Sequence, residues 1–549
     1  MNRTTVAGLL WDRADDDRPA VRSGNEQWSW REAVALGEAR GAWLNSWPAP
    51  GGRSRHVGVL LGNVPEYLWW LEAAALTGSV VVGINSTRRG QALADDIRRT
   101  DCDVLVTDGE GAALVAGLDL GIPAERILRI DADGYDDLVP PARLDPVAVE
   151  PKATFLLLFT SGTTGDPKAV ICTQGRLAGI SYRSAGFYGY HPDDVAYCMM
   201  PLFHGNALMA LWGPALAVGA TVVLAPRFSA SGFGRDVRRY GVTMFTYVGK
   251  ALAYILATPE ADDDAATSLV RGFGTEASPA DQAAFERRFG CRLTEGYGSS
   301  EGGVAITRTP DTPPGALGLA AEDCAVVDPA TSLECPPATF DERGRLTNAT
   351  EAIGEIVNRS GPGRFEGYYA DEEATAGRLR HGWYWTGDLA YRDEDGYFYF
   401  AGRRGDWMRV DSENLTAGPI ERVLIRHPDL ASVAVYPVPD PRTGDQVMAA
   451  VELLPGRTFD PAEFTAFLAD QDDLGRKWAP FFVRVSPALP QTASGRIIKD
   501  SLRRQGWWEG PDDVYARDGG RLVLLTHEAR NRRRAEFRAH GRSDLLGRS

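Results

Sequence analysis

Short apolar runs recur along the first half of the chain, with helical segments between them. The runs at 57–61, 79–82, 104–106 and 221–224 are rich in valine and leucine, a composition typical of buried strands. Because strands and helices alternate, the pattern predicts an α/β fold with mixed and largely parallel sheets flanked by helices.

A second pattern of strands begins near Trp407. Runs at 433–435 and 447–451 predict strands of a compact cap. A chain of 549 residues also exceeds what one hydrophobic core usually supports. We therefore predict a large domain over residues 1–403 and a small α+β domain over residues 404–549, with a hinge at 403–406.

One uncharged stretch has nearly the length of a membrane-spanning helix. Residues 208–226 carry no charge over 19 positions, and a span needs about 20 apolar residues. However, the stretch contains Gly213-Pro214 and changes near Gly219 to the β-branched run 221–223. It therefore predicts a buried helix followed by a buried strand, and no membrane span.

Charge and cysteine usage narrow the class of protein. The formal net charge is −15, which argues against a nucleic-acid partner, because phosphate backbones favour clustered lysine and arginine. The six cysteines are scattered without a CxxC pair, as expected for reduced thiols in the cytoplasm. The apolar run at 6–11 is too short for the core of a signal peptide.

The most specific candidate for chemistry is the segment 159–168, which follows the apolar run 155–159. Glycines let successive backbone N–H groups turn inward, hydroxyls add donors, and a lysine adds positive charge beside phosphates. The spacing is not that of a Walker P-loop, and composition alone would also fit a surface turn. The predicted phosphate-binding residues are Thr160, Ser161, Gly162, Thr163, Thr164, Gly165 and Lys168.

This decapeptide resembles the phosphate loop of the adenylate-forming superfamily, which includes acyl-CoA synthetases, luciferases and peptide-synthetase adenylation domains. Further motifs of the family follow in the same order, so the resemblance covers essentially the whole chain. They are 294–301, 367–369 with 373–375, 384–388, 402–403, 413–414 with 419–421, and 490–496. The resemblance implies the adenylate-forming fold, in which a mobile C-terminal domain rotates between an adenylation state and a thioester-forming state.

The resemblance also assigns roles to individual residues. Tyr297 would stack on adenine, Glu301 would bind Mg²⁺, and Asp388 would hold the ribose hydroxyls. Taken alone, Glu301 also suits a helix N-terminus and Asp388 a turn after Gly387. The other residues assigned to the nucleotide or acyl-adenylate are Gly274, Thr275, Glu276, Gly298, Ser300 and Arg403, and those assigned to the CoA-side loop are Ser412, Glu413 and Asn414.

These residue types suit the activation of a carboxylic acid. Joining the acid to the α-phosphate of ATP makes AMP the leaving group, and Lys168, Mg²⁺ and Arg403 would neutralise the crowded phosphate charge. His204 stands alone between Phe203 and Gly205. A lone histidine is usually structural, but the family places an aromatic residue or a histidine here, at the acyl pocket. A gating or carboxylate-orienting role and a structural role are both open.

Position 496 departs from the family, which usually has a lysine there that bridges the substrate carboxylate and phosphate during adenylation. Arg496 presents a planar fork in place of a compact point charge. The chain has 5 lysines among its 59 basic residues, so drift toward arginine is an alternative, and Lys499 could substitute. We interpret Arg496 as a sign of weak adenylation, with thioester formation retained from an acyl adenylate made by a partner enzyme. Ser412, where the family usually has glycine, leaves the geometry of the CoA side open.

Within the superfamily, residues 83–90 and 506–527 resemble the very-long-chain fatty-acid and sterol-side-chain CoA ligases. This implies a bulky hydrophobic acid, with CoA, Mg²⁺ and ATP or acyl-AMP as the other reactants. Arg496 adds a resemblance to non-adenylating ligases of the platensimycin–platencin type. The alternatives are a complete ATP-dependent ligase, a silent adenylate-binding homologue, a luciferase-like oxygenase and a transporter. A homodimer, and contacts of the basic helix predicted at 530–534 with CoA phosphates or a membrane, are left open.

Overall fold

The computed structural model describes residues 3–48, 51–160, 167–248, 250–275, 277, 279–320, 323–342, 346–403, 407–410, 413–442, 444–471, 474, 478–492 and 496–546. Contacts between Cα atoms divide the chain into two compact units. The first contains the described residues of Met1–Gly303 and Pro362–Arg378, and the second contains those of Val304–Gly361, Leu379–Thr492 and Arg496–Ser549.

One sheet of the first unit carries the predicted phosphate-binding segment at its edge. Its strands run in the order β6-β5-β3-β4-β7-β8, and all neighbours are parallel except β7 and β8. The runs predicted as strands at 57–61, 79–82 and 104–106 all fall in this sheet. Its strands are β3 His56–Leu60, β4 Val80–Gly83, β5 Val104–Thr107, β6 Ile127–Arg129, β7 Thr154–Thr160 and β8 Lys168–Thr173.

A second sheet of the same unit has the order β13-β12-β11-β9-β10-β1-β2, and every pair except the β1–β2 hairpin is parallel. Parallel neighbours need crossover connections, which helices supply here. The strands are β1 Pro19–Ser23, β2 Glu26–Ser29, β9 Val195–Cys198, β10 Thr221–Leu224, β11 Met244–Val248, β12 Arg271–Thr275 and β13 Arg292–Tyr297. The helices after β10, β11 and β12 are α9 Ala230–Tyr240, α10 Lys250–Leu256 and α11 Pro279–Phe289.

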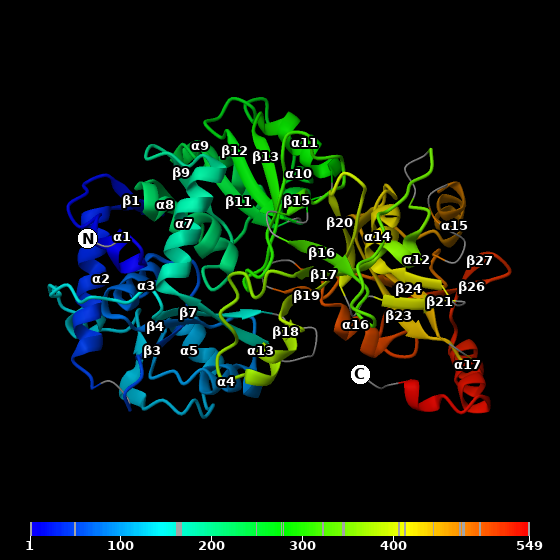
Figure 1. The fold of residues 1–549 in the computed structure, drawn as a ribbon, viewed down its shortest axis with the longest axis horizontal. Helices are drawn as coiled ribbons and strands as arrows, with labels where there is room; N and C mark the ends of the chain where they lie inside the picture. The colour runs from blue at the N-terminus through cyan, green and yellow to red at the C-terminus, as the bar shows by residue number, and fades with distance from the viewer. Residues whose placement is uncertain are drawn as a thin grey trace. The chain divides into compact units, whose positions relative to one another are not determined.

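Helices fill the space between the two sheets of the first unit (Figure 1). Helix α3 (Pro65–Thr77) is apolar on all sides, and Tyr67–Leu76 is buried throughout, as expected of a helix covered on every face. Its proline at the first turn and Gly78 at its end, with φ of 69°, mark both termini. Helices α2 (Trp30–Asn45) and α7 (Gln174–Tyr188) pack in the same core. The predicted α/β architecture is therefore confirmed.

The uncharged stretch at 208–226 forms a helix and then a strand, as predicted. A π-helix, η2 (Asn206–Trp212), continues into α8 (Gly213–Val218). Gly219 ends the helix with a φ of 80°, and the buried strand β10 follows. Among the residues that the structure describes, no helix is both long enough and apolar enough to cross a membrane.

Among the described residues, the second unit contains two larger sheets and two short strand pairs, β21 with β22 and β14 (Ile306–Thr307) with β15 (Leu319–Ala320). The first sheet has the order β16-β17-β19-β18 with β20 paired to β19, and the second has the order β23-β24-β25-β26-β27. The runs predicted at 433–435 and 447–451 lie in β23 and β24. The strands are β16 Cys324–Val327, β17 Gly354–Asn358, β18 Leu379–Arg380, β19 Trp383–Arg392, β20 Phe398–Arg403, β21 Trp407–Val410, β22 Glu413–Thr416, β23 Leu430–Pro439, β24 Asp445–Leu453, β25 Phe482–Ser486, β26 Asp513–Asp518 and β27 Arg521–Leu524.

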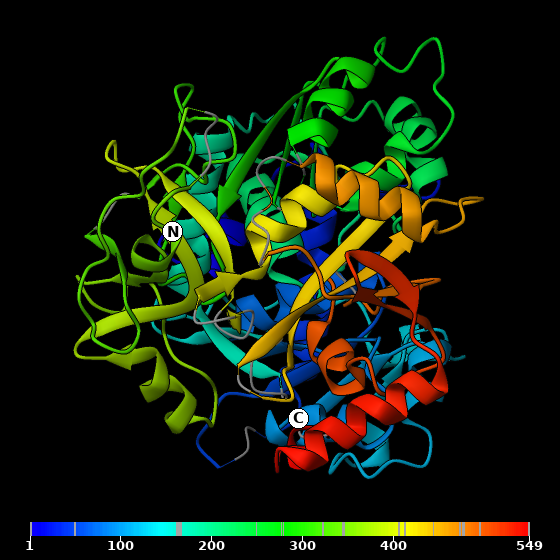
Figure 2. The ribbon, with the colours of Figure 1, turned by 90° about the vertical axis from the view of Figure 1, so that its right-hand side faces the viewer.

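The helices of the second unit are α12 Ala349–Ala352, α14 Ala417–Leu424, α15 Pro461–Asp470, α16 Lys499–Gln505 and α17 His527–Ala539. Helix α17 contains the arginine-rich stretch predicted as a helix, and it lies beside the segment that follows α16 (Figure 2). The stretch is not simply a solvated face, because Arg533 stacks 4.8 Å from the ring centre of Phe481 and Arg534 donates to the carbonyl of Trp508. Arg532 remains exposed.

Arg484 on β25 anchors the segment after α16. Its side chain is fully buried. The guanidinium donates to Gln505 at 2.6 Å, to the carbonyl oxygens of Gly506 and Glu509, and to Asp512 at 3.3 Å. This network therefore joins the sheet of the second unit to the C-terminal part of the chain. The hinge prediction falls on residues 404–406, outside the described residues, so the division at 403/404 stays a prediction.

Candidate functional site

The predicted phosphate loop begins and ends on two bonded strands. Thr160 at the end of β7 pairs with Lys168 at the start of β8 in antiparallel register. The hairpin therefore fixes the point from which the Lys168 side chain starts. The other predicted residues of this loop, Ser161, Gly162, Thr163, Thr164 and Gly165, lie outside the described residues.

Lys168 and Glu301 both contact the same tyrosine, Tyr368. The ammonium nitrogen of Lys168 lies 5.4 Å from the ring centre of Tyr368. The Tyr368 hydroxyl donates to Glu301 Oε1 at 3.2 Å, and Nε of Arg378 donates to the same hydroxyl at 3.0 Å. Tyr368 is 4% and Glu301 6% exposed. The structure therefore brings two predicted catalytic residues into one buried cluster.

The backbone around Glu301 is held separately from its carboxylate. One guanidinium nitrogen of Arg176 in α7 donates a hydrogen bond to the carbonyl oxygen of Ser300. The other terminal nitrogen donates to the carbonyl oxygen of Ile171 in β8. Gly302 has a φ of 71°, and a Cβ there would lie 2.6 Å from the guanidinium of Arg176. Arg176 therefore ties the segment of Ser300 and Glu301 to the strand that begins with Lys168.

Other predicted residues collect at the carboxyl ends of parallel strands, where ligands of open α/β sheets usually bind. Gly274 and Thr275 end β12, and Tyr297 ends β13. A Cβ at Gly274 would lie 2.3 Å from the ring of Tyr247, so only glycine fits beside that ring. Among the described residues, no atom lies within 4 Å of a Cβ built at Gly298, the residue that follows Tyr297. Glu276 lies outside the described residues.

His204 follows the carboxyl end of β9 and precedes the π-helix η2. Its backbone N–H donates to Pro201 O at 2.9 Å. The next residue, Gly205, packs so closely on Ser300 that a Cβ there would lie 2.7 Å from the serine Oγ. Short π-helical segments are often found at functional sites. The fold thus brings the His204 segment to the segment of Ser300 and Glu301.

The donor set fits a nucleotide-bound magnesium ion better than a site built wholly from protein ligands. In the described part of the chain, no group of three or more His, Cys, Asp or Glu residues is placed to hold a metal ion. Mg²⁺ on a nucleotide usually takes one or two carboxylates, with phosphate and water as the other ligands. Glu301, which accepts from the Tyr368 hydroxyl and forms a 4.0 Å ion pair with Arg378, would supply one such carboxylate.

In the second unit, Asp388 and Arg403 lie opposite each other. They pair in antiparallel register on β19 and β20. The backbone N–H of Asp388 donates to Thr386 Oγ1, and Gly387 has a φ of 74°. This backbone fits both predicted roles of Asp388, as a turn residue and as a ligand of the ribose hydroxyls. Glu413 and Asn414 begin β22, which pairs with β21. Ser412 lies outside the described residues.

Arg496 is held by a local backbone bridge. Its N–H donates to Thr492 Oγ1 at 3.1 Å, and its carbonyl accepts from the Thr492 N–H at 2.7 Å. Lys499, three residues later, forms an ion pair with Glu421 at 2.8 Å. Glu421 also accepts from the Val435 N–H at 2.7 Å. The ammonium of Lys499 is therefore engaged within its own unit, which disfavours the alternative that Lys499 substitutes for the family lysine.

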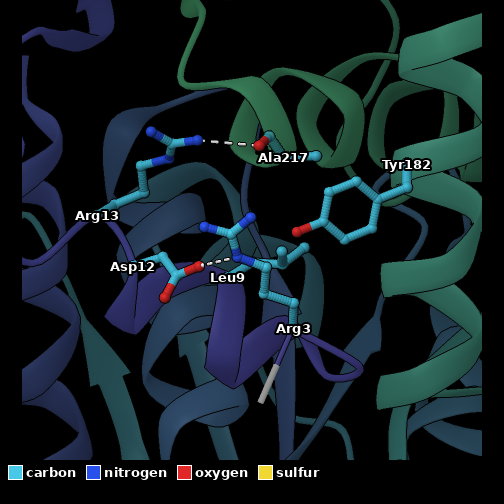
Figure 3. A pocket seen from close by; sticks show the side chains of 6 residues that line it. All are labelled: Arg3, Leu9, Asp12, Arg13, Tyr182 and Ala217. Carbon is cyan, nitrogen blue, oxygen red and sulfur yellow. Dashed lines mark hydrogen bonds and ion pairs between the residues drawn. The ribbon is translucent and has the colours of Figure 1, made fainter. Parts of the chain in front are cut away.

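A small surface pocket between α1 (Val6–Trp11), α7 and α8 contains none of the predicted site residues (Figure 3). Its charged groups already have partners. Arg3 pairs with Asp12 at 2.7 Å, and Arg13 donates to the carbonyl of Ala217 at 2.9 Å. A polar pocket of this kind does not suit a hydrophobic acid.

Three residues of the site were missed by sequence reasoning. Tyr368 belongs to a motif that supports the family resemblance, but no role was assigned to it. Arg176 and Arg378 carry no motif signal at all. Tyr368 reaches Glu301 across 67 positions of sequence, and a contact of that separation leaves no periodic pattern in the chain.

Comparisons with known proteins agree with this arrangement. The family model described as AMP-binding enzyme matches residues 11–369, and the one described as AMP-binding enzyme C-terminal domain matches residues 419–496. The chain therefore belongs to the AMP-binding enzyme family, the adenylate-forming enzymes that its motifs predicted. Its fold is similar to the crystal structure of ATP-bound MatB from Rhodopseudomonas palustris, with a TM-score of 0.78 and 24% identity over 92% of this chain and 98% of that one.

Two curated relatives narrow the class. The chain is 55% identical to the steroid-22-oyl-CoA synthetase of Rhodococcus jostii (strain RHA1), over 100% of this chain and 99% of the relative. It is 48% identical to the medium/long-chain-fatty-acid–CoA ligase FadD17 of Mycobacterium tuberculosis (strain ATCC 25618 / H37Rv), over 91% of this chain and 96% of the relative. The chain is thus an acid–thiol ligase of the acyl-CoA synthetase branch. The predicted use of ATP, Mg²⁺ and CoA agrees with this class, and one matching structure, MenE of Bacillus subtilis, holds ATP and magnesium.

Proposed function

We propose that this ligase converts a bulky hydrophobic carboxylic acid, of the steroid side-chain or long-chain fatty type, into its CoA thioester. The observation that carries the proposal is the 55% identity, along the full length of the chain, to a relative named for a steroid substrate. The 48% identity to a fatty-acid ligase points to the same kind of acid. Small polar acids would gain little from a hydrophobic pocket.

The proposed chemistry has two steps. In the first, an acid oxygen attacks the α-phosphorus of ATP and pyrophosphate leaves. In the second, the sulfur of CoA attacks the acyl carbon, the bond to the AMP oxygen breaks, and AMP leaves. Mg²⁺ held by Glu301 would offset phosphate charge, and Lys168 would face the phosphates from the edge of β8.

The remaining predicted residues would orient the acyl adenylate. Tyr297 would stack on adenine, and Asp388 would accept both ribose hydroxyls, with Arg403 opposite it on the neighbouring strand. His204 would border the acyl group, and Ser412, Glu413 and Asn414 would face CoA. In this proposal the chain divides at residue 403/404, and the smaller domain presents Arg496 in one state and Glu413 in the other.

Arg496 would make the first step slower than the second. Guanidinium is a wide planar group, and placing it between two oxygens that are about to react should displace one of them. Losing a preorganised contact of this kind costs about a hundredfold in rate. The thioester-forming state does not require position 496, so a separate adenylating enzyme could supply the acyl-AMP. A complete ATP-dependent ligase is the second candidate, and full-length similarity to a named synthetase favours it.

Two parallel assays separate these candidates. One supplies a steroid side-chain acid, ATP, Mg²⁺ and CoA, and the other supplies the synthetic acyl-AMP of that acid with CoA. The proposal expects thioester from both, with a rate at least about tenfold higher from acyl-AMP. Equal rates would show a complete ligase. Acyl-AMP that binds tightly without forming thioester would show a silent homologue.

A further inference from the structure

Residues 366–369 lie along the strand that begins with Lys168. The N–H of Ile171 donates to Gly367 O at 3.1 Å, and the N–H of Tyr369 donates to Ala169 O at 2.8 Å. Between these bonds, Tyr368 pairs with Val170 as an isolated antiparallel bridge. Backbone bonds on both sides therefore fix the position of Tyr368 relative to β8.

The two ends of this contact are also anchored. Glu366 accepts from the N–H and the hydroxyl of Thr173 at 2.8 and 2.7 Å. The backbone N–H of Tyr368 donates to Thr375 Oγ1 at 2.9 Å. Since both anchors hold the segment to β8 or to itself, the phenol of Tyr368 has little freedom to leave its position.

The hydroxyl of Tyr368 stands between groups of opposite charge. Arg378 Nε can only donate, so the hydroxyl accepts from it at 3.0 Å and gives its own proton to Glu301 Oε1 at 3.2 Å. The terminal guanidinium nitrogen of Arg378 remains 4.0 Å from Glu301.

The ring of Tyr368 contacts a different group, the ammonium of Lys168. The ammonium of Lys168 lies 5.4 Å from the ring centre, within the range of a cation–π contact. One side chain thus contacts the lysine that would face the phosphates and the carboxylate that would hold the metal ion. Tyr368 therefore joins the two groups.

We propose that Tyr368 is a positioning residue for the nucleotide site: its hydroxyl orients the Glu301 carboxylate toward Mg²⁺ and holds Arg378 in a loose ion pair with that carboxylate, at 4.0 Å, while its ring holds Lys168. This inference rests on the proposed function, because it concerns the same nucleotide. Partners that orient a metal ligand typically contribute about 10–100-fold to metal affinity. Without the hydroxyl, Arg378 would close on Glu301 and neutralise it.

The test is a titration of Mn²⁺, as a stand-in for Mg²⁺, into the ATP-bound protein, followed by electron paramagnetic resonance. Tyr368→Phe removes the hydroxyl and keeps the ring, so the affinity for Mn²⁺ should fall about tenfold or more. ATP affinity measured without a metal ion should change less than about twofold, because the ring still contacts Lys168. A general loss of structure would lower both affinities together.

Tyr369→Phe is the matched control. Tyr369 lies in the same segment and also loses one hydroxyl contact, the 2.7 Å bond to Asp101. That bond lies outside the cluster of Lys168 and Glu301, so Mn²⁺ affinity should remain within about twofold of the unsubstituted protein.

A double variant tests the mechanism. If the hydroxyl holds Arg378 in that loose ion pair with Glu301, Tyr368→Phe with Arg378→Gln should regain part of the lost Mn²⁺ affinity, which a purely structural defect would not do. Equal Mn²⁺ affinity in the Tyr368→Phe and unsubstituted proteins overturns the positioning role and leaves the proposed function standing. Failure of the unsubstituted protein to bind ATP with either metal ion overturns the proposed function itself.

Discussion

Lys168 and Arg496 are two of the cations that the family resemblance assigns to the reacting groups, and one lies in each unit. Lys168 begins a strand that is bonded along β7, and its ammonium lies over the ring of a buried tyrosine. Arg496 is fixed by backbone bonds to Thr492, within a bridge of a few residues. The ring of Tyr368 thus contacts the Lys168 ammonium, and Thr492 fixes the backbone of Arg496.

The difference bears on why lysine is retained at one position and absent from the other. With 5 lysines among 59 basic residues, arginine is the usual cation of this chain. A compact ammonium and a planar guanidinium are not interchangeable where a phosphate has to be contacted as a point charge. We infer that drift alone does not account for both positions.

The largest expected effect tests the core of the unit that contains Arg496. Arg484→Met should lower the free energy of unfolding by about 3–5 kcal/mol, because Asp512 loses its buried partner and the carbonyls of Gly506 and Glu509 lose a donor. Denaturant unfolding measures the change. Arg532→Met on the exposed face of α17 should cost less than about 0.5 kcal/mol. A similar loss in both variants would contradict the anchoring role.

Removing the first cation comes next. Lys168→Met should slow adenylation by about 10²–10³-fold, as expected for the loss of a preorganised charge at a developing anion. Exchange of labelled pyrophosphate into ATP measures this step. Lys152→Met, at an exposed lysine of the same unit, is the control and should leave the exchange unchanged. An unchanged rate for Lys168→Met would show that the ammonium does not act on the phosphates.

Replacing Arg496 should have the opposite effect and raise the rate of adenylation. Arg496→Lys should raise pyrophosphate exchange by up to about a hundredfold, because a point charge fits between the reacting oxygens. Thioester formation from synthetic acyl-AMP should change by less than about twofold. No gain in exchange would remove the reason for assigning weak adenylation to Arg496.

A pH dependence should appear in the first unit. Both oxygens of the fully buried Glu72 lack a hydrogen-bond partner among the described residues, and burial raises the pKa of Glu72 from its ordinary 4.5 to about 8 despite the opposing charge of Arg40. The folded state then holds a proton that the unfolded state releases, so stability is lost as the pH rises from 4.5 through 8.

The matching variant is Glu72→Gln, which has no proton to release. Relative to the unsubstituted protein, its free energy of unfolding should increase by roughly 3–4 kcal/mol between pH 5 and pH 8 and level off above that. Denaturant unfolding at several pH values measures this difference. A difference that is flat with pH would mean that Glu72 is ionised in the fold.

The smallest effect concerns Lys499. In the Arg496→Lys background, Lys499→Met should change pyrophosphate exchange by less than about threefold, since the ammonium is paired with Glu421. Thermal unfolding would report any loss of that ion pair. Abolished exchange in the double variant would show that Lys499 acts on substrate.

Patterns local in sequence explain which parts of this account were predictable. The apolar runs at 57–61 and 221–224 form strands because short β-branched and leucine runs bounded by turns are buried on both faces. The uncharged stretch at 208–226 predicts a helix and then a strand because its pattern changes at Gly219 from helix-like to a β-branched run. The motifs with Lys168, Tyr297 and Asp388 were visible because their residue types are unusual in combination.

Contacts between distant residues were not predictable. Tyr368 meets Glu301 only because residues 366–369 return to β8, and Arg378 has no sequence signal for its bond to that phenol. The buried network of Arg484 and the packing of Arg533 on Phe481 are similar cases, since an arginine on the surface and one in a core look alike in sequence. The ion pair of Lys499 depends on α14 lying beside the start of α16.

The most direct test supplies ATP, Mg²⁺ and CoA together with one acid at a time, and detects the thioester and AMP by mass spectrometry. The acids are a C22 steroid side-chain acid, a long-chain fatty acid and acetate. The account predicts thioester and AMP in equal amounts from one or both bulky acids and none from acetate. No thioester from either bulky acid, and none from its synthetic acyl-AMP, would contradict it.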